Sequence, residues 1–119
     1  MKRDFDLIRK ILLYVEEEQK DYVEVINNFE GCDNITLMHH CDLLLERNLL
    51  NGTVTRVNTG EGHFVCKGLT WEGHDYLAMI KNDTTWNKIK KIVKEKGEYL
   101  TIEIISRIAT NLIENKLGI

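Results

Sequence analysis

Residues 34–77 read NITLMHHCDLLLERNLLNGTVTRVNTGEGHFVCKGLTWEGHDYL, and this stretch decides the fold. It begins with a helical pattern, continues with two strand patterns separated by the turn GEG, and ends in the start of another helix. Helix, hairpin and helix in this order are the layout of a winged helix-turn-helix. The stretch therefore predicts a mainly α fold with a small β-hairpin, extended by further helices toward the C-terminus.

The first part of this stretch, residues 34–47, has apolar residues at the spacing of one helix face. The apolar stripe consists of Ile35, Met38, Cys41 and Leu45, with Leu37 and Leu44 beside it. The residues expected on the more exposed side are Thr36, His39, His40, Asp42 and Glu46. Asp33 or Asn34 is expected to cap the helix, and Asn48 suits the left-handed backbone that ends one.

Two strands are predicted at residues 50–57 and 63–68. Gly60 and Gly62 lie between them and permit the positive φ angles that a tight turn requires. Because side chains alternate along a strand, Phe64 and Cys66 are expected on one face of the hairpin.

The segment before this stretch contains one clear helix and one ambiguous element. Residues 4–17 have apolar residues at helical spacing, and Asp4 is a suitable N-cap. Residues 21–30, DYVEVINNFE, are compatible with a short strand or with a helical turn. A winged helix-turn-helix would need both a strand and a helix here, and the segment has room for only one.

Three helices are predicted after the hairpin, at about residues 70–82, 84–96 and 101–116. Thr70 is expected to cap the first helix, and Asp83 or Thr84 the second, which Gly97 ends. The second helix is rich in lysine, and the third repeats apolar residues at nearly every fourth position. Trp71 and Trp86 are expected to pack in the core, because their helix positions suit burial better than a ligand-stacking pair.

Length and composition indicate a single cytoplasmic domain. The chain has 119 residues and a formal net charge of −3, with an isoelectric point near 5.8. We expect residues 1–69 to form a winged-helix-like core and residues 70–119 to form helices that pack on it or on a partner. The three cysteines, Cys32, Cys41 and Cys66, favour reduced thiols over disulfides. No apolar run approaches the length that a membrane span needs.

Catalysis, metal binding and cofactors are not indicated. His63 and Cys66 are the one pair of soft ligands at close spacing, but in a strand they point to opposite faces. No phosphate-binding glycine loop and no nucleophile motif is present. We therefore expect no enzymatic activity, no metal site and no cofactor.

Two functions remain, which are DNA binding and protein–protein interaction. Double-stranded DNA would be contacted by exposed residues of the 34–47 helix, the hairpin and the lysine-rich helix: Thr36, His39, His40, Arg56, Lys67, Lys88 and Lys91. The acidic balance and the cation-poor 34–47 helix favour instead a protein-interaction module on the same scaffold. The last helix is expected either to complete the core of the chain or to form a homodimer, and the interface of that dimer would consist of Ile104, Ile105, Ile108 and Leu112.

The sequence resembles a family of small bacterial and prophage-encoded proteins known as a domain of unknown function. The opening MKRDFDLIRKIL is close to the start of that family, and GLTWEGHDYL at residues 68–77, followed by Trp86-Asn87-Lys88, matches its central signature. The segment from His40 to Leu50 is similar to a further family segment, with Asn48 where glycine is usual. The resemblance implies a winged-helix fold and a phage or mobile-element origin, and it supplies no catalytic residues.

Overall fold

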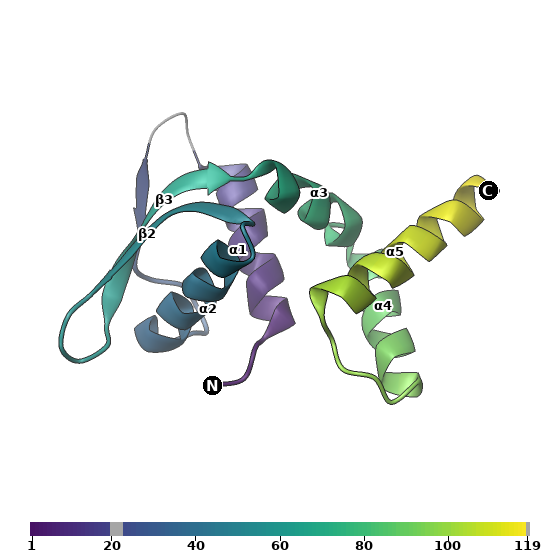
Figure 1. Cartoon of the computed structure of the whole chain (residues 1–119), viewed down its shortest axis with the longest axis horizontal. Coiled ribbons are helices and arrows are strands. Elements are labelled where there is room, and N and C mark those ends of the chain that lie inside the picture. The colour runs from purple at the N-terminus through teal and green to yellow at the C-terminus, as the bar shows by residue number, and fades with distance from the viewer. Residues whose placement is uncertain (20–22, 119) are drawn as a thin grey trace. The chain divides into compact units, whose positions relative to one another are not determined.

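Five helices and a three-stranded antiparallel sheet make up the part of the chain that our computed structural model describes, residues 1–19 and 23–118 (Figure 1). The predicted mainly α architecture with a small hairpin is confirmed at this level. The chain divides into two compact units, Met1–His74 and Asp75–Ile119.

The first unit is a small sheet with two helices against one of its faces (Figure 1). Its elements in chain order are α1 (Phe5–Glu18), β1 (Glu24–Ile26), α2 (Asn34–Glu46), β2 (Leu50–Arg56) and β3 (Gly62–Leu69), followed by the start of α3 (Trp71–Ile80). The strand order is β1-β3-β2, with both pairings antiparallel. The helix and strand boundaries predicted from the sequence are therefore confirmed to within one or two residues.

The core of the first unit lies between the two helices and the inner face of the sheet. The buried side chains of α1 are Phe5, Leu7, Ile8, Ile11, Leu12 and Val15, and those of α2 include Leu37, Met38, Cys41 and Leu44. Phe64 and Cys66 face this core from β3, as strand alternation predicts. Gly52 lies opposite, at an irregularity in the β2–β3 register, where a Cβ atom would come within 2.6 Å of the Phe64 ring. Glycine is therefore required for the ring to pack against the strand.

The ambiguous segment at residues 21–30 contains a strand. Glu24–Ile26 pairs with β3, and no helix lies between Val23 and α2. Asp21 and Tyr22, which belonged to the same prediction, lie outside the described residues. The Tyr14 hydroxyl donates a 2.6 Å hydrogen bond to the Glu24 carboxylate and ties the strand to α1. This hydrogen bond and the partial burial of the phenol raise the pKa of Tyr14 to about 12.

The Asn34 side chain joins the start of α2 to the hairpin. Its amide donates to the carbonyl oxygens of Asn27 and Gly62, both at 2.8 Å. Its carbonyl oxygen accepts from the Gly62 N–H at 2.7 Å. Asp33, rather than Asn34, is the N-cap, because its carboxylate accepts from the Thr36 N–H. The Asn34 amide thus holds the start of β3 through Gly62 and the segment after β1 through Asn27.

The base of the hairpin is closed by hydrogen bonds between two turns. Asn48 ends α2 with a φ of 57°, as predicted. The Thr70 hydroxyl donates to the Asn48 carbonyl at 2.5 Å and accepts from the Gly73 N–H at 2.8 Å, so it also caps α3. A Cβ atom at Gly73 would lie 2.0 Å from the Leu49 carbonyl oxygen. Only glycine therefore lets the first turn of α3 approach the backbone of Leu49.

Trp71 was predicted to be a core residue, and this prediction is wrong. Its side chain is 80% exposed, whereas Trp86 is buried as predicted. The reason lies in the first turn of α3, where Thr70 and Gly73 face the turn at Asn48 and Leu49. Trp71 is left on the outer side of the same turn.

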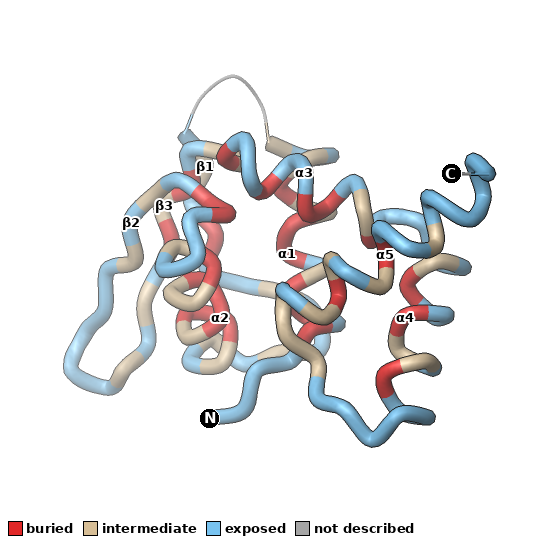
Figure 2. The backbone as a smooth tube through the Cα atoms, turned by 45° about the vertical axis from the view of Figure 1, so that its right-hand side comes forward, coloured by how far each residue is buried: buried red, intermediate tan, exposed pale blue. Residues whose placement is uncertain are grey.

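The second unit contains the end of α3, then α4 (Asp83–Glu95) and α5 (Ile102–Leu117), which pack against each other. The alternation of buried and exposed residues along α4 is visible in Figure 2. Asp83 or Thr84 was predicted to cap α4, and this prediction is wrong. Asn82 is the cap, because its side chain accepts from the Thr85 N–H at 3.0 Å. Gly97 follows the last residues of α4 with a φ of 67°, as expected.

The Thr70 hydroxyl can be tested by substitution. Thr70→Val keeps the side-chain shape but removes both hydrogen bonds, leaving the buried Gly73 N–H without its acceptor. We expect the free energy of unfolding to fall by about 1–3 kcal/mol. Thr70→Ser, which keeps the hydroxyl, should lose less than half of that. Urea denaturation measures both, and a Thr70→Val variant as stable as the wild type would contradict this role.

Candidate nucleic-acid interface

His40 was predicted to be an exposed DNA contact on α2, and the structure overturns this. The side chain is 0% exposed. Its Nε2 accepts a 2.8 Å hydrogen bond from the Asp4 backbone N–H, and its Nδ1 lies 2.8 Å from the Thr36 carbonyl oxygen. Since an amide N–H only donates and a carbonyl only accepts, the ring is neutral with its proton on Nδ1. His40 joins α2 to the N-terminus and is not available to a ligand.

The other two predicted contacts on α2, Thr36 and His39, are half-buried. The His39 ring lies edge-on to His40, with ring centroids 5.5 Å apart. Near Thr36 stands the capping carboxylate of Asp33, whose pKa is lowered by the hydrogen bonds it accepts from Thr36. This end of α2 thus presents a negative charge, which disfavours a phosphate.

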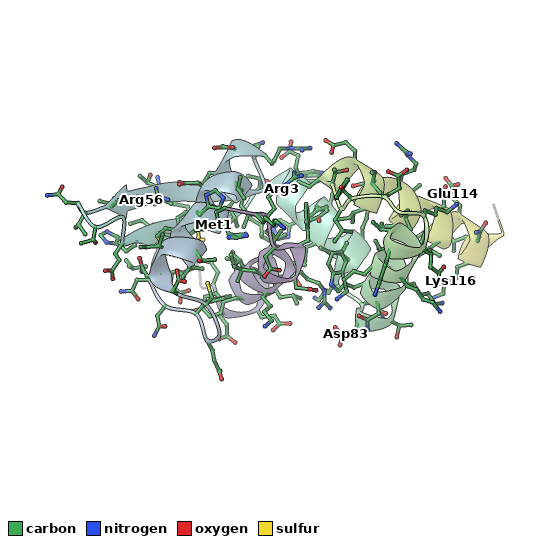
Figure 3. All side chains as sticks on the ribbon, turned by 90° about the horizontal axis from the view of Figure 1, so that it is seen from below. Met1, Arg3, Arg56, Asp83, Glu114 and Lys116 are labelled. Atoms are coloured by element: carbon green, nitrogen blue, oxygen red, sulfur yellow. The ribbon has the colours of Figure 1, made fainter. Side chains whose placement is uncertain are left out.

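The two cations predicted on the hairpin do not form one surface. Arg56, labelled in Figure 3, pairs with the Asp42 carboxylate of α2. Lys67 is exposed near the other end of β3, because Arg56 pairs with Gly62, five residues earlier in that strand. At about 3.3 Å per residue the two positions are about 16 Å apart. The hairpin therefore offers one neutralised and one isolated cation.

The remaining predicted contacts, Lys88 and Lys91, are exposed on α4. They are three positions apart, so they lie on one side of the helix, and Lys94 continues the row. Lys91 lies 4.0 Å from the Glu95 carboxylate, and both side chains are largely in solvent. Lys90 lies over the Trp86 ring instead, at 5.7 Å from its centroid. Lys94 was not among the predicted contacts, although its spacing from Lys91 is visible in the sequence.

Charge is divided unequally between the two units. Residues 1–74 contain eight Lys and Arg against 13 Asp and Glu, a formal charge of −5. Residues 75–119 contain eight against six, a formal charge of +2. The unit that contains the hairpin and α2 is thus acidic, and the unit that contains α4 is basic.

Of the residues predicted for a dimer interface, three are available and one is not. Ile105 is 0% exposed within the chain, so the prediction that it faces a partner is wrong. Ile104, Ile108 and Leu112 are half-buried and line a groove between α4 and α5. The sequence did not separate these faces, because apolar residues surround more than half of α5.

Among the described residues, no group of three or more His, Cys, Asp or Glu side chains is arranged to hold a metal ion. The thiols of Cys41 and Cys66 are buried. Burial raises the pKa of Cys41 to about 12 and raises that of Cys66 as well. The half-buried Cys32 has its pKa raised by burial and by the nearby Asp33 and Asp4 carboxylates.

These features define a small, mainly helical protein with a three-stranded antiparallel sheet and a separate basic helix. None of the helices in the described part of the chain is long and apolar enough to span a bilayer. The chain belongs to the DUF2513 family, described as a hypothetical protein family, whose model matches residues 2–99. It is 34% identical to an uncharacterized protein of Haemophilus influenzae, over 99% of this chain and 100% of the relative. No solved structure matches the chain.

The thiols provide a test of the buried site. With a thiol reagent such as Ellman's at pH 8, we expect the folded chain to react at Cys32 alone. Cys41 and Cys66 are buried, and their raised pKa values reduce the fraction of reactive thiolate. Cys32→Ser should abolish the reaction in the folded state. Cys41 and Cys66 should react only after denaturation. Rapid reaction of two or more thiols in the folded protein would contradict the packing described for α2 and β3.

Proposed function

We propose that the protein is a non-enzymatic, DNA-associated protein whose phosphate contacts come from α4. The observation that carries this proposal is the row of exposed lysines, Lys88, Lys91 and Lys94, on the basic second unit. Lysine ammonium groups along one helix side suit the phosphates of a duplex, and such contacts carry no sequence preference. Thr36, His39 and Lys67 are only secondary candidates for a phosphate contact, because each one is isolated from other cations or lies next to a carboxylate.

We further propose that the first unit is a variant of the winged helix. The order α1, β1, α2, β2, β3 and the strand order β1-β3-β2 support this. The variant has one helix, α2, between β1 and β2 among the described residues. In this proposal α2 is a structural helix and not the one that reads bases. A cytoplasmic location and a mobile-element origin, such as a prophage regulator, are consistent with this role.

A second candidate function is a protein-interaction module. Trp71, which is exposed at the start of α3, favours it, since tryptophan is enriched where proteins bind one another. The formal charge of −5 on the first unit would suit a basic protein partner and would repel DNA. The two functions differ in which unit carries the contact.

The DNA proposal is tested by fluorescence anisotropy with a labelled 30-base-pair duplex of arbitrary sequence. We expect a dissociation constant on the order of 10⁻⁴ to 10⁻⁶ M, which weakens as salt rises. Lys88→Gln/Lys91→Gln should reduce the slope of log K against log salt by about 2, because each phosphate contact contributes about 0.9. The variant should weaken binding equally for unrelated sequences.

Lys2→Gln/Lys10→Gln is the matched control, since it removes the same charge from exposed positions of the first unit. It should leave the salt slope unchanged. Equal effects of the two double variants would show that binding follows total charge and not α4. Absence of binding at 100 µM protein and 50 mM salt would overturn the DNA proposal and leave the protein-interaction module.

A further inference from the structure

The groove between α4 and α5 has a volume of about 430 Å³. Its apolar walls are Ile92 of α4 and Ile104, Ile108 and Leu112 of α5. Its polar rim is formed by Lys96, Glu98, Arg107, Asn111 and Asn115. Ile105 and Ala109 of α5 are fully buried and do not line it. The helix therefore has two apolar sides, one packed within the chain and one open.

Two of the charged side chains on α5, Arg107 and Glu114, are arranged symmetrically about the middle of this open side. Ile108 and Leu112 are centred on residue 110. Arg107 and Glu114 are seven residues apart, so they lie on the same side of the helix, and their midpoint falls between residues 110 and 111. The two midpoints differ by about 0.8 Å along the helix axis. Both side chains are exposed, and Figure 3 shows Glu114 near the C-terminal end of α5.

We propose that the groove is occupied by α5 of a second copy of this chain, with the two helices antiparallel about a two-fold axis near residue 110. Ile108 then contacts the partner subunit's Leu112, and Arg107 pairs with the partner subunit's Glu114. The two-fold axis repeats both contacts. A parallel arrangement would place Arg107 and Arg107 of the partner subunit on opposite sides of the interface, so neither ion pair could form. The charges thus favour the antiparallel arrangement, in which α5 of each copy packs into the groove of the other copy.

This dimer is small and leaves the basic side of α4 free. The 16 residues of α5 extend about 24 Å, so the interface is below about 1,200 Å² in total and is typical of weak complexes. We expect a dissociation constant on the order of 10 µM. Lys88, Lys91 and Lys94 do not line the groove. The inference therefore stands or fails separately from the DNA proposal.

The first test is sedimentation equilibrium of the full-length protein from 2 to 200 µM. The wild type should change from monomer to dimer across this range. Ile108→Glu should weaken the dimer by at least about 100-fold, because two isoleucine side chains leave the interface. Ile113→Glu, the same change at an exposed position of α5 outside the groove, should stay within about twofold of the wild type.

The second test decides the direction of the helices. Arg107→Glu and Glu114→Arg should each weaken the dimer by about tenfold, because each creates two like-charge pairs in place of two ion pairs. The double variant restores opposite charges and should return the dissociation constant to within about threefold of the wild type. Circular dichroism should be used to check that each variant is folded. If Ile108→Glu is not folded, the exposed charge variants still test whether α5 forms the dimer interface.

A wild type that is monomeric at 200 µM overturns the inference, whatever the outcome with DNA. A dimer that Ile108→Glu does not weaken overturns the groove as the interface. A double charge variant that is no tighter than the single variants overturns the antiparallel arrangement.

Discussion

The hydrogen bond from the Thr70 hydroxyl to the Asn48 carbonyl is the contact on which the rest of the first unit depends. It joins the end of α2 to the start of α3 and so closes the hairpin at its base. The Thr70 oxygen also accepts a hydrogen bond from the N–H of Gly73, the third residue of α3, and the lack of a side chain at Gly73 lets that helix approach the Leu49 backbone. The order of the elements alone would leave the position of the first turn of α3 open. One hydroxyl and one missing Cβ atom fix that turn against the backbone of Asn48 and Leu49.

Three polar side chains, Asn34, His40 and Asp42, hold α2 at its other end and along its length. Asn34 binds the hairpin at the first residue of α2, and His40 binds the N-terminal backbone two turns later. Asp42, on the same helix, pairs with Arg56 of β2. The polar residues of α2 are thus largely used within the first unit. Few polar side chains of α2 are therefore left to bind a ligand. This agrees with the proposal that the basic residues of α4 make the phosphate contacts.

The features predicted correctly from the sequence are those that depend on neighbouring residues. Helix and strand boundaries follow from apolar periodicity and from caps such as Asp4 and Thr70, which act over three or four residues. The exposed lysines of α4 follow in the same way. The burial of His40 and the pairing of Arg56 with Asp42 were not predicted, because their partners, Asp4 and Asp42, are 36 and 14 residues away. Trp71 was misjudged because its size favours burial, while its exposure is decided by the residues on either side.

The Asn34 side chain also determines which part of the hairpin can change in length. Because it holds the first residue of β3, the paired strands are fixed up to Arg56 and from Gly62 onward. The intervening residues 57–61 bond chiefly among themselves, through Val57, Gly60 and Glu61. Insertions and deletions in this loop would leave the scaffold intact, whereas a change of length on either side would break the strand register. The tip of the hairpin in this chain can therefore change in length independently of the paired strands.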